Sequence, residues 1–124
     1  MGVKKTGSIA IADQSVAAGV TVNGTIDDLS DGYGTYVVEV ENDDESGPST
    51  SPELYLELAT TSGGFAGGTA VRVPSLPCPT DENAFTRFVI PVPLDVLYSR
   101  ISFTAGASAS SRVVAYLHKT DQPA

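Results

Sequence analysis

The chain has 124 residues, of which 41% are apolar and 18% are charged, and its formal net charge is −8. This length suits one domain with its own core, and the composition excludes an intrinsically disordered chain. The acidic balance also disfavours DNA and RNA as partners, because phosphate backbones are bound by Lys and Arg. We therefore expect a single globular domain, residues 1–124, that binds no nucleic acid.

Alternation of apolar and polar residues recurs along the chain, and segments rich in Gly, Pro, Asp and Ser separate the alternating runs. A period of two is typical of β-strands with one buried face. In chain order, the expected strands are 8–12, 20–26, 36–41, 54–59, 71–73, 87–92, 101–104 and 112–118. About eight strands predict an all-β fold, an antiparallel two-sheet sandwich of the jelly-roll type.

The same alternation predicts which side chains share a face of a strand. Residues expected to share a face are Ile9 with Ile11, Tyr36 with Val38 and Val40, and Leu54 with Leu56 and Leu58. The last run, 112–118, is expected to be apolar on both faces.

Helical signals are few. Ser51-Pro52-Glu53 resembles a helix start, but the leucines that follow keep a period of two, so we predict a strand there. Apolar residues with helical spacing after Pro93 predict at most a short helical turn near Leu94–Ser99. The glycine-rich segment 63–68 is expected to be a mobile hairpin or loop tip.

Residue types that carry chemistry are scarce. The chain has one cysteine, Cys78, and one histidine, His118, far apart in the sequence, so we expect a buried or half-buried Cys78 and no enzyme. The acidic run Glu41–Glu45 lacks the spacing of a calcium loop and reads as a solvated loop, although an adventitious ion there stays open. We expect no cofactor and no dedicated metal site.

Targeting signals are not evident in this sequence. The first residues are not followed by an apolar run typical of a secretory signal, and no stretch of about 18 apolar residues is present. We therefore expect synthesis in the cytoplasm and no membrane partner.

Several segments carry a resemblance to a known family. They are Gly24–Leu29, Tyr36–Val40, Pro91–Leu94, Tyr98–Gly106, Arg112–Leu117 and Asp121–Gln122. This succession of strands and turns, from Gly24 onward, resembles the jelly-roll cement (decoration) proteins of tailed bacteriophages. The chain departs from that pattern in its longer loop from Glu41 to Pro52 and in its N-terminal segment.

The resemblance implies a structural role and no chemistry. A protein of this kind is made in a bacterial host, sits on the outer capsid surface of the virion, binds the major capsid protein and stiffens the shell. It also implies a homo-oligomer, with a dimer favoured and a trimer as the alternative.

Candidate contacts with the capsid or with other copies come from tyrosines, basic residues and the two ends of the chain. Tyrosine joins apolar area to a polar tip and is enriched at interfaces, although ordinary packing explains each one equally well. Residues 1–6 and 119–124 lie outside the expected strands and are predicted to be flexible arms. The candidate contact residues are Lys4, Lys5, Tyr33, Tyr55, Tyr98, Arg100 and Tyr116.

Two other functions fit the same strand pattern. One is another virion part, such as a head-completion, tail or head-fibre component. The other is a carbohydrate-binding or adhesin-like β-sandwich module, which the absence of Trp disfavours.

Overall fold

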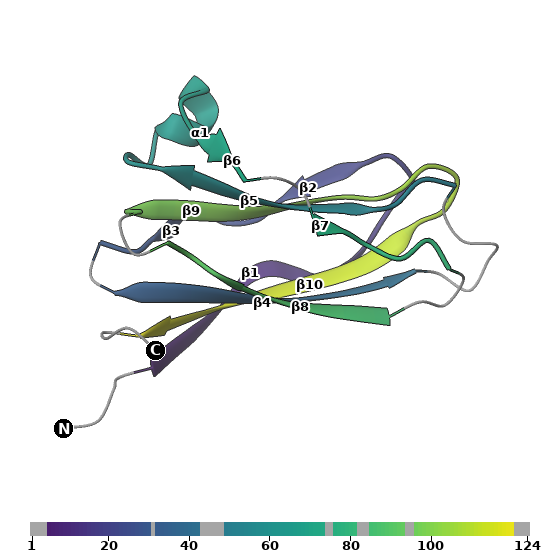
Figure 1. Ribbon diagram of the computed structural model, residues 1–124, viewed down its shortest axis with the longest axis horizontal. Helices are drawn as coiled ribbons and strands as arrows, with labels where there is room; N and C mark the ends of the chain where they lie inside the picture. The colour runs from purple at the N-terminus through teal and green to yellow at the C-terminus, as the bar shows by residue number, and fades with distance from the viewer. Residues whose placement is uncertain are drawn as a thin grey trace.

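Two antiparallel β-sheets pack face to face in the computed structural model, which describes residues 5–30, 32–42, 49–73, 76–81, 85–93 and 96–120 (Figure 1). The first sheet has the order β1-β10-β4-β8, and the second β2-β9-β5-β6. The bounds in the first sheet are β1 (Lys5–Val16), β10 (Ser111–Thr120), β4 (Tyr33–Asn42) and β8 (Phe85–Pro91). Those in the second are β2 (Thr21–Asn23), β9 (Tyr98–Thr104), β5 (Glu53–Ala59) and β6 (Val71–Arg72), with β3 (Asp27–Asp28) beside β9 and β7 (Leu76–Pro77) beside β5.

The strand order is that of a jelly roll. β2 and β3 follow one another along β9, and β6 and β7 follow one another along β5, so each pair acts as one interrupted strand. If each interrupted pair is counted as one strand, the chain has eight strands, and we number them 1 to 8 along the sequence. They lie in the orders 1-8-3-6 and 2-7-4-5, which is the order of two interlocked Greek keys. The predicted all-β antiparallel sandwich of the jelly-roll type is confirmed, and each of the eight expected strands matches a strand of the fold.

The core lies between the sheets and follows the period-two pattern. Tyr36, Val38 and Val40 of β4 are all buried, as expected, and they face the other sheet. The second sheet supplies Leu54, Ile101 and Phe103, which are also fully buried. Each fully buried large apolar side chain contributes about 1.5–3 kcal/mol by leaving water, so these central strands stabilise the sandwich most.

One expectation about strand faces was wrong. Ile9 and Ile11 do not share a face, because Ile9 is exposed while Ile11 is buried, and the pairing of β1 with β10 shifts register between them. Such a bulge reverses the face on which the following residues lie. In β10 the run 112–118 carries apolar residues on both faces, as expected: Val113 is buried in the core, while Tyr116 is exposed on the outer face.

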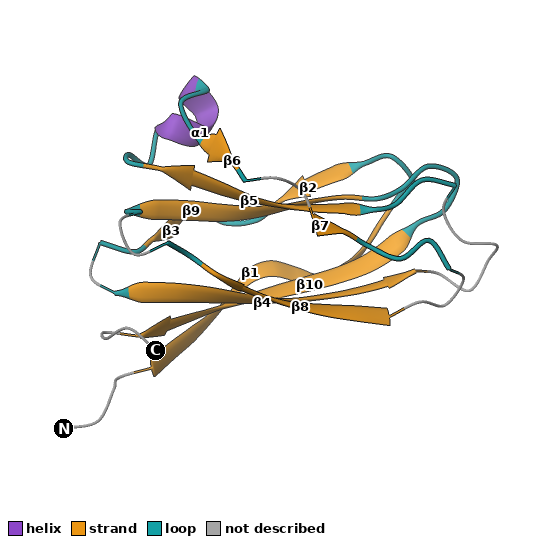
Figure 2. Ribbon diagram, viewed as in Figure 1, coloured by secondary structure: helices purple, strands orange, loops and turns teal. Residues whose placement is uncertain are grey.

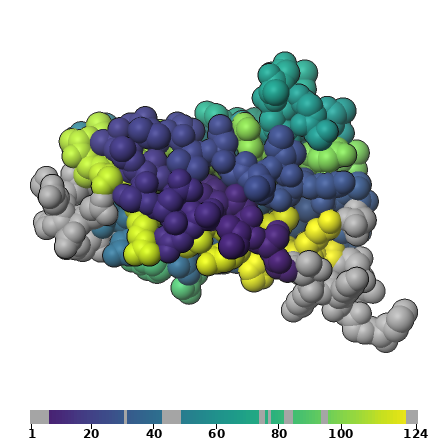
Figure 3. Space-filling model, turned by 180° about the vertical axis from the view of Figure 1, so that it is seen from behind, coloured from purple at the N-terminus to yellow at the C-terminus, as the bar shows by residue number. Residues whose placement is uncertain are grey.

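A single helix is described, and it lies where a mobile loop was expected. The four-residue helix α1 (Gly64–Gly67) projects from the body of the sandwich beside the end of β5 (Figures 2 and 3). Gly68 ends it in the left-handed region, with φ of 78°, which glycine adopts without strain. The helix is far too short to cross a membrane, and no other helix is present in the described part of the chain.

The other expected helical turn, near Leu94–Ser99, is limited among the described residues to one turn hydrogen bond, which the Val96 N–H donates to the Pro93 carbonyl at 3.3 Å. Leu94 and Asp95 lie outside the described residues, and Tyr98 and Ser99 begin β9. The strand begins this early because Ser99 and Tyr98 pair with Asp27 and Asp28 of β3.

The expected flexible arms partly belong to strands. Lys5 and Thr6 pair with Thr120 and Lys119, so the first and last strands lie side by side up to these residues. Residues 1–4 and 121–124 lie outside the described residues.

A buried polar cluster joins the two sheets at one end of the sandwich. The Tyr36 hydroxyl of β4 donates a hydrogen bond to Asp27 Oδ2 at 2.7 Å and lies 2.7 Å from the Ser99 hydroxyl. Burial raises the pKa of the Asp27 carboxyl, although the hydrogen bond from Tyr36 opposes that effect. Burial, together with the nearby Asp27 charge, also raises the pKa of Tyr36 well above its ordinary value.

Candidate interaction surfaces

An apolar row crosses the outer face of the sheet β1-β10-β4-β8. The register places Ile9 opposite Tyr116, Tyr116 opposite Val37, and Val37 opposite Val89, so one residue comes from each strand. Ile9 is 58% exposed, Tyr116 40% and Val89 66%, while Val37 is half-buried. We call Ile9, Tyr116, Val37 and Val89 the outer row. A contiguous exposed apolar strip of this kind is typical of interaction sites.

Charged residues lie on one side of the outer row. Arg87 donates two hydrogen bonds to Glu39 Oε1, at 3.1 and 2.8 Å, and Arg112 binds Asp13 with two more, at 2.8 and 2.7 Å. The hydrogen bonds from Arg112 hold the pKa of the Asp13 carboxyl below its usual value. These pairs are exposed to solvent, where water and salt screen their attraction, so they contribute little to stability.

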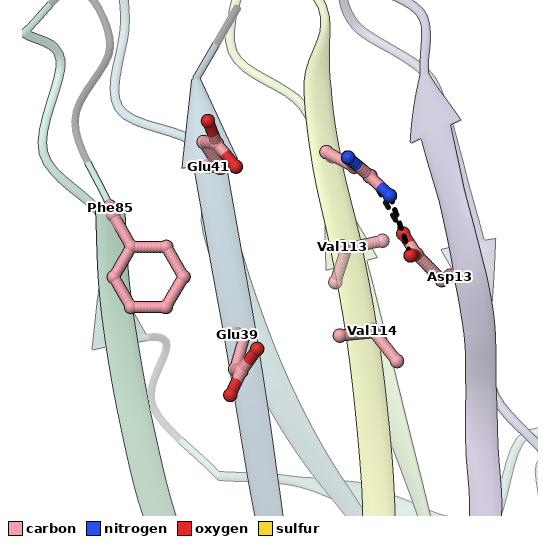
Figure 4. A pocket seen from close by; sticks show the side chains of 7 residues that line it. Asp13, Glu39, Glu41, Phe85, Val113 and Val114 are labelled. Carbon is pink, nitrogen blue, oxygen red and sulfur yellow. Dashed lines mark hydrogen bonds and ion pairs between the residues drawn. The ribbon is translucent and has the colours of Figure 1, made fainter.

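The charged side of the outer row is hollowed into a shallow open depression of about 210 Å³ (Figure 4). Its lining comes from all four strands, and Figure 4 shows β8 as the outermost strand on the side of Phe85. The lining residues are Asp13, Glu39, Glu41, Phe85, Arg112, Val113 and Val114. Arg112 and Arg87 already bind Asp13 and Glu39, so the third carboxylate, Glu41, leaves a net negative charge that suits a basic group better than an anion.

The outer face of the second sheet carries a different arrangement, centred on Glu57 of β5. Glu57 is only 8% exposed, and its Oε1 accepts hydrogen bonds from Ser102 at 2.7 Å and from Arg100 at 3.2 and 3.0 Å. Arg72 adds a weaker ion pair at 3.8 Å. Burial by itself raises the pKa of Glu57, but the hydrogen bonds and the two arginine charges outweigh it, and the net pKa is lowered.

Two aromatic rings complete the Glu57 cluster. The Arg72 guanidinium lies 4.2 Å from the centre of the Tyr55 ring, and that of Arg100 lies 5.0 Å from the centre of the Phe65 ring in α1. The arginines therefore join α1 and β6 to the middle of the sheet. This geometry serves local structure, because both guanidinium groups already have an acidic and an aromatic partner.

The structure distributes the predicted contact residues over both faces. Tyr55 and Arg100 lie together in the Glu57 cluster, whereas Tyr116 belongs to the outer row on the opposite side of the sandwich. Tyr33 and Tyr98 are half-buried at the starts of β4 and β9. The Lys5 backbone pairs with Thr120, and Lys4 lies outside the described residues. Their roles as contacts stay predictions.

Sequence reasoning missed several residues of these surfaces. Ile9, Val37 and Val89 were read only as strand residues. An apolar residue on the polar face of the strand was the signal for Val37 and Val89, whereas Ile9 gave none because a bulge in β1 decides its face. Arg72, Glu57 and Phe65 gave no such signal, because three separate segments bring them together.

Two expectations about chemistry concern Cys78 and a metal site. Cys78 is buried, as expected, and burial raises the pKa of its thiol to about 12, so it stays protonated and unreactive at neutral pH. Within the described ranges, no group of three or more His, Cys, Asp or Glu side chains is arranged to hold a metal ion. Of the acidic run Glu41–Glu45, residues 43–45 lie outside the described residues.

Proteins of known structure share the fold at low sequence identity. VP2 of an infectious bursal disease virus subviral particle aligns over 95% of this chain and 32% of its own, with 13% identity and a TM-score of 0.56. A chain of the Gx strain of that virus gives the same coverage and identity with a TM-score of 0.55. A chain of the Bacillus endospore appendages, a family of disulfide-linked pili, aligns over 94% of this chain and 86% of its own, with 12% identity and a TM-score of 0.53.

These likenesses establish a shared sandwich fold, and this chain spans about a third of the length of the viral chains it matches. Family 29 carbohydrate-binding modules align less well, with a TM-score of 0.44. No protein-family model and no curated protein matches the sequence.

Proposed function

We propose that the protein is a structural component of a bacteriophage virion, a decoration protein that binds the outer face of the major capsid shell and stabilises it. The proposed role is not enzymatic and needs no cofactor. The observation that carries the proposal is the outer row, which exposes apolar side chains across a regular four-stranded sheet.

The outer row favours binding to another protein surface. Covering apolar area releases about 25 cal/mol for each Å² removed from water, so three exposed side chains in one line favour association. The depression beside the row adds carboxylates that complement basic side chains on a partner. Together they suit a flat protein surface that is apolar with a basic margin.

Two further observations support a virion role. The sequence resembles the phage cement proteins from Gly24 onward, and the jelly-roll fold of this chain is also found in VP2 of a viral subviral particle. The net charge of −8 keeps a free protein soluble at the high copy number that decoration of a whole shell requires.

Stabilisation of the shell follows from mass action. A protein that binds the assembled shell and not its dissociated subunits raises shell stability by RT ln(1 + [L]/Kd), about 2.7 kcal/mol per site at a hundredfold excess over Kd. Hundreds of such sites would raise the temperature at which the shell opens.

The test uses purified expanded capsids that lack the protein. We expect the wild type to bind them and to raise their melting temperature in differential scanning calorimetry. The variant Tyr116→Glu places a charge in the outer row and is expected to bind at least tenfold more weakly. Val71→Glu places the same charge at an exposed apolar residue of the other sheet, 65% exposed against 40% for Tyr116; it is the control and should bind like the wild type.

Two results would contradict the proposal. One is a wild-type protein that does not bind such capsids in co-sedimentation. The other is equal binding by both variants, which would remove the outer row from the contact.

Copy number in the particle separates decoration from the other virion roles. Hundreds of copies support decoration, whereas a small fixed number at one vertex would point to a head-completion or tail component. Binding to a glycan array would instead favour the carbohydrate-binding alternative.

A further inference from the structure

In the part of the chain that the structure describes, the sandwich has four sheet edges, and one of them is a long regular strand. β1 is interrupted by two register shifts, β2 and β3 form a broken edge, and β6 and β7 are two residues each. β8, by contrast, pairs with β4 without interruption from Phe85 to Pro91. Natural sheets usually blunt their edges with short strands, bulges, prolines and charges, because an open edge pairs with other chains. On β8 these devices are limited to Arg87 and to Pro91 at the end of the strand, which has no N–H to donate.

β8 is also apolar on both sides, which is typical of a strand with neighbours on both edges. Its outward residues include Phe85, 55% exposed, and Val89 of the outer row. Its inward residues Phe88 and Ile90 pack against the core but stay partly exposed at the open side of the sandwich. Among the described residues, the ladder of β8 has one partner strand, β4.

The one charge on β8 does not oppose a neighbour. Arg87 is held by two hydrogen bonds to Glu39 on the adjacent strand β4, so its charge is compensated within the same molecule. A second β8 strand would therefore meet apolar and neutral side chains along this edge. The net charge of −8 on each copy opposes association at long range, but the side chains along this edge are neutral apart from the paired Arg87.

We propose that two copies of the chain pair through their β8 edges, antiparallel, to form one continuous eight-stranded sheet. Identical strands that pair antiparallel are related by a two-fold axis perpendicular to the sheet. The outer rows of the two copies then lie on the same side and form one apolar band across the dimer. The pairing is independent of the proposed function, whereas the use of this band as a shared docking platform rests on it.

The size of the contact sets the expected affinity. Seven paired residues span about 23 Å, so the strip covered is on the order of 300 Å² per copy, below the standard size of a stable interface. We therefore expect a weak dimer with Kd in the micromolar range or above. Binding of both copies to one surface would strengthen the pairing through effective concentration.

The test is sedimentation velocity of the full chain from roughly 1 to 500 μM, a range that brackets such a Kd. We expect the wild type to pass from monomer to dimer and Val89→Lys to dimerise at least tenfold more weakly. Ile9→Lys, at the other end of the outer row and on the opposite edge, is the matched control and should dimerise like the wild type. Circular dichroism and a thermal melt show whether each variant is folded.

A second measurement keeps the test valid if Val89→Lys fails to fold. Hydrogen exchange of the β8 amides in the wild type should slow as concentration rises, whereas the β1 amides should not change. The proposal is overturned by a wild type that stays monomeric with unchanged β8 exchange, by a trimer, or by Ile9→Lys weakening dimerisation as much as Val89→Lys.

Capsid binding, measured on the same samples, separates the two proposals. A wild type that dimerises through β8 but does not bind capsids supports the pairing and refutes the decoration role. A wild type that binds capsids but stays monomeric up to 500 μM supports the decoration role and refutes the pairing.

Discussion

Replacing Tyr36 by phenylalanine tests whether the polar cluster at the end of the sandwich stabilises the fold. The Tyr36 side chain has no exposed surface, and phenylalanine occupies nearly the same volume, so the change leaves no cavity. It removes one hydroxyl, which donates to Asp27 and lies within hydrogen-bond distance of Ser99. Because these partners sit in β3 and β9 while Tyr36 sits in β4, the lost contacts are those that join the two sheets.

The size of the effect follows from the two hydrogen bonds. A hydrogen bond to a charged group contributes about 1.5–3 kcal/mol, and one between neutral groups about 0.5–1.5 kcal/mol. Ser99 has no exposed surface and would lose a partner that water does not replace. We therefore expect Tyr36→Phe to lower the free energy of unfolding by about 2–4 kcal/mol, which for a domain of this size lowers Tm by roughly 10 °C.

Equilibrium unfolding in urea, followed by far-UV circular dichroism, measures this loss as a lower midpoint with an unchanged m-value. Tyr116→Phe is the matched control: Tyr116 is 40% exposed, and its removal of a hydroxyl should change stability by less than about 0.5 kcal/mol. If Tyr36→Phe is as stable as the control, the reasoning is refuted, because the cost of burying Asp27 would then cancel the gain from its hydrogen bond.

Two pH-dependent predictions follow from the shifted carboxyl groups. Glu57→Gln removes the charge that holds Arg100 and should cost about 2–3 kcal/mol at pH 7, against less than about 1 kcal/mol for Glu39→Gln on the exposed surface. Because the pKa of Glu57 is lowered, its contribution is present above its unfolded pKa and is lost as pH falls through the lower folded pKa. The difference between wild type and Glu57→Gln in urea unfolding should therefore shrink below about pH 4, and a constant difference would contradict this. Asp27 behaves oppositely. Because burial raises its pKa, the contribution of Asp27 to stability is present at low pH and is lost as pH rises through its pKa in the folded state. Asp27→Asn still accepts from Tyr36 and should gain stability relative to wild type as pH rises from about 3 to 7, whereas a relative loss would show that the Asp27 charge stabilises the cluster.

The positions of the strands were predictable because they depend on local periodicity. All eight expected runs are strands, and the alternation of Tyr36, Val38 and Val40 identified the buried face of β4 correctly. The prediction failed at Ile9, where a bulge in β1 changes the face, because a bulge is set by the pairing with β10 rather than by the residues of β1 alone.

The candidate surfaces were less predictable, because each is assembled from distant segments. Tyr116 was selected from the sequence, but its neighbours Ile9 and Val89 join it only through the register of three strand pairs. Likewise Arg100 was selected, whereas its contacts with Glu57 and Phe65 depend on how β5 and α1 sit beside β9.

The amino-acid sequence by itself determined the class of fold, since a period of two with frequent turn residues leaves an antiparallel sandwich as the way to bury so many alternating side chains. Only the tertiary structure decided which strands lie at the edges and which apolar residues stay in water. Val89 and Val113 are both strand valines in the sequence, yet one is 66% exposed on an edge and the other is buried in the centre of its sheet. The physical reason is that burial depends on long-range strand order, and strand order is settled by packing between segments that are far apart along the chain.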